Sequence, residues 1–165
     1  MGRQVYDVDL SKVYTDQKKF HLGDFFVEQD AKFVFVKYNQ GDGSVAGTAG
    51  LLCYQIGSAT TGFERFEVTC DYDSATIVAL LQASIGVLQA TLADGEYGWA
   101  QFEGFGVKDI TTDGNVTAGL RLMAGSANGT IIPHDATASL DIGVALEVDA
   151  AAVLAAGKYK LNIPI

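Results

Sequence analysis

The chain has 165 residues, a length that suits one domain with a buried core. Its residues are 48% hydrophobic, and 19 glycines stand beside only two prolines, which indicates many tight turns rather than disorder. The formal net charge is −9. This argues against nucleic acid as a partner, because binding to phosphates requires clustered Lys and Arg side chains.

The acidic excess lies entirely after residue 37. Residues 1–37 hold six basic and six acidic side chains, whereas the rest of the chain holds five basic and fourteen acidic ones. Two interpretations of this asymmetry stay open. Either the acidic surface only keeps the protein soluble, or a neutral N-terminal end docks on a partner while an acidic body faces solvent.

Residues 1–19 mix charged and apolar side chains with no sustained period, and they do not open with a signal-peptide pattern. We therefore expect synthesis in the cytoplasm. One interpretation of the segment is an arm that orders on a partner, and the other is an edge strand followed by a short helix. The predicted organisation is an N-terminal arm over residues 1–19 and one β domain over residues 20–165.

Residues 20–38 predict the first β-hairpin, with a polar turn over residues 28–31. The returning strand is rich in aromatic and β-branched side chains. Side chains alternate between the two faces of a strand, which places Phe33 and Phe35 on one face and Val34 and Val36 on the other. Both faces are apolar, so we expect this strand to be buried on two sides.

A turn over residues 39–44 leads to a predicted strand over residues 51–56. A loop then precedes residues 63–70, where Phe66, Val68 and Cys70 alternate with Arg65, Glu67 and Thr69, which predicts a half-exposed strand. Cys53 and Cys70 are too few and too widely spaced for a metal or redox motif, and we expect both to be small buried hydrophobic residues.

Residues 75–92 fit both a helical spacing and an alternating one. Gly86 and several β-branched residues favour two short strands joined by a bend over a helix. Polar residues interrupt this apolar run, which makes it a poor membrane span.

Residues 95–104 contain the only tryptophan and follow a turn at Asp94. In a strand, Trp99 and Gln101 lie on one face, and Ala100 and Phe102 on the other. We expect the turn to set the strand register and Trp99 to fill the core.

Further short strands are predicted over residues 107–110, 116–124, 142–148 and 158–165, with a corner at 131–134 and a helical turn over 149–156. Many short strands between glycine turns predict an all-β protein. The expected fold is a compact β-barrel or β-sandwich with an N-terminal arm.

No catalytic or metal-binding pattern is present in the sequence, and we expect no enzyme activity, cofactor or metal. Neither His21 nor His134 accompanies a nucleophile motif, and both are expected in turns or at the surface. Asp71, Asp73 and Ser74 could supply oxygen ligands to a calcium ion, but the twelve-residue loop that is typical of a calcium site does not follow them. Residues 128–130 match the sequence of a glycosylation sequon, but the sequence shows no secretory context in which it would be used.

A series of short segments carries a family resemblance. In chain order they are residues 22–24, 32–36, 49–52, 95–101 with Gly104, 118–122 and 142–147. This pattern, over roughly residues 20–165, resembles the capsid decoration or cement proteins of tailed bacteriophages, which are small head-stabilising proteins. The resemblance implies a structural virion protein, made in the host cytoplasm, that binds the outer surface of an assembled capsid and ties neighbouring subunits together. The implied partners are the major capsid protein and further copies of the chain in a homotrimer, with no membrane and no nucleic acid.

Under this interpretation the arm contacts the capsid. The candidate contact residues combine cations with apolar side chains: Arg3, Val5, Tyr6, Leu10, Lys12, Lys18 and Lys19. The alternative function is a receptor- or glycan-binding module of a phage head or tail fibre. That function would require an exposed ring at Tyr54, Tyr97 or Trp99.

Overall fold

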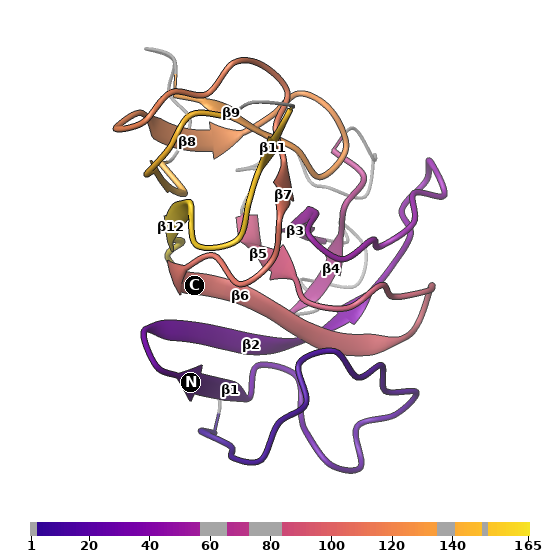
Figure 1. The fold of residues 1–165 in the computed structure, drawn as a ribbon. Helices are drawn as coiled ribbons and strands as arrows, with labels where there is room; N and C mark the ends of the chain where they lie inside the picture. The colour runs from indigo at the N-terminus through magenta and orange to yellow at the C-terminus, as the bar shows by residue number, and fades with distance from the viewer. Residues whose placement is uncertain (1–2, 57–65, 73–83, 135–140, 150–151) are drawn as a thin grey trace.

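The structure is a computed structural model that describes residues 3–56, 66–72, 84–134, 141–149 and 152–165. Every regular element in these residues is a β-strand, twelve in all, which confirms the all-β prediction (Figure 1). No helix long and apolar enough to span a membrane occurs in this part of the chain.

Five strands close into a barrel at the centre of the molecule. Their order around the barrel is β2 (Ala31–Tyr38), β4 (Glu67–Thr69), β3 (Leu52–Gln55), β5 (Ser84–Leu88) and β6 (Tyr97–Phe105), after which β6 pairs back with β2. The β2–β6 pair is antiparallel and runs from Lys32 opposite Glu103 to Lys37 opposite Tyr97. Closure leaves none of these five strands as an open edge, which removes a common template for aggregation.

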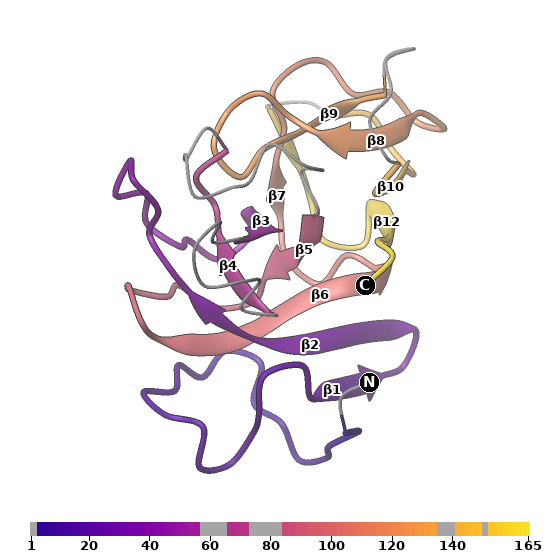
Figure 2. The ribbon, with the colours of Figure 1, turned by 180° about the vertical axis from the view of Figure 1, so that it is seen from behind.

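The remaining strands extend this sheet on two sides. β1 (Phe25–Glu28) forms a hairpin with β2. From β6 the sheet continues through β12 (Tyr159–Asn162), β10 (Gly143–Ala145), β8 (Arg121–Ala124) and β9 (Ile131–Pro133). A separate pair joins β7 (Ile110–Thr111) to β11 (Val153–Leu154). Figure 2 shows β1 and the N-terminal chain below the barrel and strands β8 to β10 above it.

Buried side chains fall into one central core and two flanking cores. The barrel interior is filled by residues from all five of its strands, among them Val34, Val36, Cys53, Val68, Ile85 and Ala100. A second core, containing Phe20, Phe33, Phe35 and Trp99, lies between the N-terminal chain and the outer wall of the barrel. A third core joins Leu52, Tyr54 and Val87 of the barrel to Leu122, Ala145, Tyr159 and Leu161 of the C-terminal strands.

The strands β2 and β6 confirm the two-faced patterns predicted for them. Phe35 packs outside the barrel and Val36 inside it, and both are 0% exposed. Trp99 is likewise 0% exposed and lies on the opposite side of β6 from Ala100. Trp99 therefore fills a core, as expected, and that core is the one beneath the N-terminal chain.

The prediction of a half-exposed strand at residues 63–70 is wrong for the polar side chains that were expected to face solvent. Glu67 is only 8% exposed and Thr69 is fully buried. The Lys37 ammonium lies 3.1 Å from a Glu67 carboxylate oxygen and pairs with its charge. Asn39 donates to the same oxygen, so the carboxylate is partly buried at little cost in free energy. Arg65 lies outside the described residues.

Three other local predictions need correction. Val153–Leu154, expected in a helical turn, forms β11 because it pairs with β7. The predicted corner at 131–134 contains strand β9, and the strand predicted from residue 116 begins only at Arg121. Of the ambiguous apolar run, Ser84–Leu88 is strand β5, in agreement with the strand interpretation, while residues 75–83 lie outside the described residues.

Gly104 explains why β6 can pass the β1–β2 hairpin so closely. Its φ of +93° lies in the left-handed region, and a Cβ atom there would lie 1.9 Å from the carbonyl oxygen of Asp30. Any other residue would be strained and would also push the turn away. The glycine that ends the tryptophan segment is thus required by a close approach of two backbones.

Replacing Trp99 with Ala should destabilise the fold strongly. The ring is fully buried, and large-to-small changes of buried aromatic residues cost about 3–5 kcal/mol. Urea denaturation would measure the free energy of unfolding. Tyr6→Ala, which truncates an aromatic side chain that is 73% exposed, serves as the control and should change stability by about 0.5 kcal/mol or less. A Trp99→Ala protein as stable as the wild type would contradict this packing.

Both thiols should be unreactive in the native protein. Cys53 and Cys70 are 0% exposed, which agrees with the sequence expectation. Burial raises the pKa of Cys70 to about 12 and raises the pKa of Cys53 well above its ordinary value. Since the thiolate is the nucleophile, titration with a disulfide reagent at pH 8 should detect neither cysteine until denaturant unfolds the chain. Rapid labelling of either thiol without denaturant would show that the barrel opens.

Candidate interaction surface

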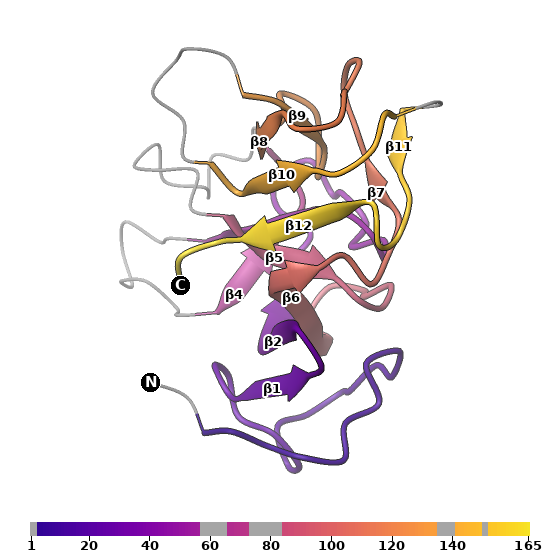
Figure 3. The same cartoon turned by 60° about the vertical axis from the view of Figure 1, so that its left-hand side comes forward.

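The N-terminal segment, residues 3–24, lies against the outer wall of the barrel beside β1, β2 and β6 (Figure 3). Val5 and Phe20 are its deepest apolar side chains, at 7% and 2% exposed, and both belong to the Trp99 core. The packing differs from the expectation of an arm that orders only on a partner. It arises because the outer wall of β2 and β6 is apolar and needs a cover.

Aromatic contacts account for much of this packing. The ring centroids of Phe20 and Trp99 lie 5.1 Å apart at 75°, and Tyr14 approaches Phe20 at 5.4 Å and 83°. Such edge-to-face pairs contribute about 0.5–1.5 kcal/mol each beyond the burial of area. Burial also raises the pKa of Tyr14 above its ordinary value, and the adjacent Trp99 indole opposes part of that rise.

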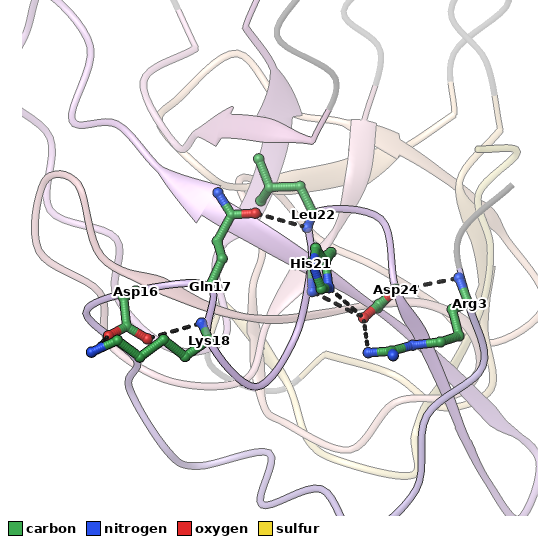
Figure 4. Close-up of polar contacts among 7 residues, drawn as sticks. All are labelled: Arg3, Asp16, Gln17, Lys18, His21, Leu22 and Asp24. Atoms are coloured by element: carbon green, nitrogen blue, oxygen red, sulfur yellow. Dashed lines mark hydrogen bonds and ion pairs between the residues drawn. The ribbon is translucent and has the colours of Figure 1, made fainter.

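A buried carboxylate fixes the two ends of the segment to each other. Asp24 is 4% exposed and accepts hydrogen bonds from the backbone N–H of Arg3 at 3.2 Å and of His21 at 2.9 Å (Figure 4). The Arg3 guanidinium also donates to Asp24 at 3.1 Å. The carboxylate is therefore well compensated, and removing it would leave these donors without their acceptor.

Backbone hydrogen bonds hold the segment at two further points. Val5 donates to the carbonyl of Phe25 at 2.9 Å, and Phe25 donates back to Arg3 at the same distance. Farther along, Tyr14 and Tyr97 exchange hydrogen bonds of 2.9 and 2.8 Å. The segment is therefore fixed along its length, and its exposed side chains are presented from an ordered backbone.

The structure divides the seven predicted contact residues into two groups. Val5 is buried and Leu10 is half-buried, so neither offers its full side chain to a partner. The other five are exposed: Arg3, Tyr6, Lys12, Lys18 and Lys19. Of these, Arg3 is paired with Asp24 and Lys18 with Asp16.

Tyr6, Lys12 and Lys19 form what we call the N-terminal patch. Tyr6 is 73% exposed. The Lys19 ammonium donates to the carbonyl of Asp7, the neighbour of Tyr6. The ammonium groups of Lys12 and Lys19 lie 5.4 and 5.1 Å from the ring centroids of Tyr14 and Phe20. Neither has a carboxylate within 4 Å in the part of the chain that the structure describes.

Sequence reasoning missed the residues that hold this patch in place. The sequence pattern places Asp24 in the predicted hairpin and in the resembling segment 22–24, and it assigns neither Asp24 nor Phe20 and Tyr14 a part in holding this patch. The sequence does carry one signal for the anchor. Asp24 follows Gly23, whose φ of +83° turns the chain into β1, and the Asp24 carboxylate can reach back to the His21 N–H three residues earlier.

The rings proposed for glycan binding are covered. Trp99 and Tyr54 are 0% exposed, and Tyr97 is half-buried and stacked on Phe35 at a centroid distance of 6.0 Å. A stacking platform for sugars requires an open ring face. This geometry does not favour the receptor- or glycan-binding alternative.

The histidines and the acidic residues form no reactive constellation. His21 is exposed, and its ring lies 3.9 Å from Asp24, whereas the half-buried His134 lies 2.8 Å from Asp141. Asp71 is buried and accepts from the Gly43 N–H, while Asp73 and Ser74 lie outside the described residues. In the residues described here, no group of three or more His, Cys, Asp or Glu side chains could hold a metal ion.

Neither a protein-family model nor a curated protein matches the sequence. Among solved structures, the chain is similar to one described as the N base of head fiber gp8.5 in bacteriophage phi29. The likeness covers 79% of this chain and 98% of the other, with 15% identity and a TM-score of 0.44. A likeness at this level carries no functional argument, and the function stays a proposal.

Replacing Asp24 with Asn should loosen the N-terminal segment. The change removes the charge that faces Arg3 and one of the two acceptor oxygens in a buried site, so we expect a loss of about 1–3 kcal/mol in the free energy of unfolding. Denaturant titration would measure this loss. Asp16→Asn is the matched control, because Asp16 pairs with Lys18 at the exposed surface and should contribute nothing measurable. Equal effects of the two changes would rule out Asp24 as the anchor.

Proposed function

We propose that the protein is a structural virion protein that binds the outer surface of an assembled phage capsid and cements neighbouring capsid subunits. The resemblance of residues 20–165 to capsid decoration proteins supports this function. The all-β fold with no reactive cluster among its described residues is compatible with a structural role.

The observation that carries the proposal is the N-terminal patch. The exposed Tyr6 is of the residue type that is enriched at interface centres, and Lys12 and Lys19 on the same segment supply positive charge of the kind found at the polar rim. The patch stands on a segment fixed by Asp24 and by the Tyr14–Tyr97 pairing. A partner would therefore bind it without first ordering a flexible arm, which lowers the entropic cost of association.

Such a protein stabilises a capsid through mass action. It binds the assembled lattice and not the separated subunits, so the lattice gains stability as its sites fill. Several copies held together, as in the homotrimer that we also propose, would bind through several linked sites and with higher overall affinity. The acidic charge of the remaining chain would keep the outer surface of the particle soluble.

The proposal is tested by adding the purified protein to capsids that lack it and measuring occupancy by co-sedimentation. Tyr6→Ala should weaken binding by about fivefold or more, because truncating a Tyr that is a binding hot spot costs over 1 kcal/mol. Lys12→Glu combined with Lys19→Glu should weaken it further, and added salt should then weaken binding less than it weakens that of the wild type, because the attracting charges have been removed.

Val153→Ala provides the control for Tyr6→Ala, because Val153 is also exposed but lies on β11, away from the N-terminal segment. The control should bind capsids as the wild type does. Full occupancy by the Tyr6 and lysine variants would exclude the patch, and absence of wild-type binding would exclude the function itself. Point variants are preferable to deletion of residues 2–19, which would remove Val5 and Tyr14 from the Trp99 core.

A further inference from the structure

The outer face of the C-terminal sheet is a second ordered surface for which the proposed function gives no role. Figure 3 shows β6, β12 and β10 side by side toward the viewer, with no other described strand crossing in front of them. We call this surface the C-terminal face and define it by six side chains: Phe105, Arg121, Val144, Leu146, Lys158 and Lys160.

The strand register places these side chains next to one another. Phe105 lies opposite Lys160, Lys160 opposite Val144, and Val144 opposite Arg121, which gives one continuous row across four strands. Leu146 and Lys158 form the next row, since Leu146 donates its N–H to the Lys158 carbonyl at 2.8 Å. Val144 and Leu146 flank the buried Ala145, and Lys158 and Lys160 flank the buried Tyr159, so both rows lie on the side away from the core.

The face exposes apolar area that the monomer does not cover. Phe105 is 44% exposed, Leu146 is 40% exposed and Val144 is half-buried. The Lys160 ammonium lies 5.6 Å from the Phe105 ring centroid, so its aliphatic stem also contributes apolar area. An apolar centre with charged residues around it is the usual composition of a protein–protein interface.

The face is also hollowed along its middle. A groove of about 390 Å³ runs over Gly143 and Val144 between Glu103, Arg121 and Lys160. Gly143 forms part of its floor, and a Cβ atom there would lie 2.3 Å from the Lys160 carbonyl oxygen. The close packing of β10 on β12 therefore depends on this glycine.

The charges on and beside this face nearly balance. Arg121 and Lys158 form ion pairs with Asp141 and Glu147, and Glu103, which lines the groove beside Lys160, pairs with Lys32. The chain as a whole carries −9, so the entire excess lies elsewhere on the molecule. Two copies of the chain repel each other in most orientations, and a charge-balanced face is one through which they can approach.

We infer that the C-terminal face binds a second copy of this chain. Its balanced charges remove the repulsion that opposes contact elsewhere, and its exposed Phe105 and Leu146 supply the apolar area that association buries. This inference deepens the proposed function, because linked capsid binding rests on self-association. It assigns the self-contact to residues outside the N-terminal segment, which leaves the N-terminal patch free in each copy.

The test is sedimentation velocity of the purified protein without capsids, across low to high micromolar concentrations. The wild type should self-associate reversibly. Leu146→Asp should weaken association at least about tenfold, because it places a charge in the apolar centre of the contact. Val27→Asp is the matched control, since Val27 is 36% exposed on β1, away from the face, and it should associate as the wild type does.

A further variant tests the charge balance at an exposed position. Lys160→Glu makes the face acidic and should weaken association, whereas Val27→Asp also adds a negative charge, away from the face, and should not. A wild type that stays monomeric at every concentration would overturn the inference, as would control variants that weaken association as much as the face variants.

The two proposals fail separately. Self-association that depends on Leu146 and Lys160 supports the inference even if the protein does not bind capsids, and that result would reject only the capsid function. A monomer that binds capsids through Tyr6 would support the capsid function and reject the self-contact.

Discussion

The pairing of β2 with β6 is the constraint on which the rest of the structure depends. It closes the barrel, and each of the two strands also forms a wall with an apolar side chain on both faces, as Val36 and Phe35 on β2 and Ala100 and Trp99 on β6 illustrate. The side chains that face inward are buried by the closure of the barrel alone. The outward ones are not, because the outer wall of a barrel in water would expose rings as large as Trp99. The covering N-terminal segment is thus a consequence of the amino-acid pattern of β2 and β6.

The same reasoning explains the positions of the two candidate surfaces. The N-terminal segment covers one side of the barrel and the C-terminal strands cover another, so each cover has an inner apolar face and an outer face left for solvent or a partner. On both outer faces cations lie over aromatic rings, with Lys19 over Phe20 at one end and Lys160 over Phe105 at the other. These outer faces carry little net charge on an otherwise acidic molecule. The proposed capsid contact and the proposed self-contact therefore occupy different layers and do not compete.

The elements that sequence reasoning predicted well are those whose signal is local and strong. The alternation around Phe33 to Val36 and the aromatic strand around Trp99 predicted both strands and both of their faces.

The features that sequence reasoning missed depend on partners that are distant along the chain. Glu67 is buried because Lys37 and Asn39 meet it from β2 and the turn after it, and Val153 is in a strand because Thr111 lies opposite it. The place of Asp24 after Gly23 is the one local sign of the anchor, and its other donor, Arg3, is far from it in sequence. For the same reason, the exposed members of the predicted contact set could not be separated from Val5 before the packing was known.

The separation of β2 from β6 along the chain has a consequence for synthesis on the ribosome. Fifty-eight residues lie between Tyr38 and Tyr97, so at typical translation rates β2 waits roughly 3–12 s before its partner has been made. During that time a strand that is apolar on both faces has only β1 and later β4 along one edge, and its other edge is open to strands from neighbouring nascent chains. The lysines at positions 32 and 37, near the two ends of this strand, place charge where such stacking would begin, and charged residues flanking an apolar strand oppose aggregation. Each of these lysines later pairs with an acidic residue of a partner strand, Glu103 or Glu67, so the charge that protects the unpaired strand is neutralised when the barrel closes.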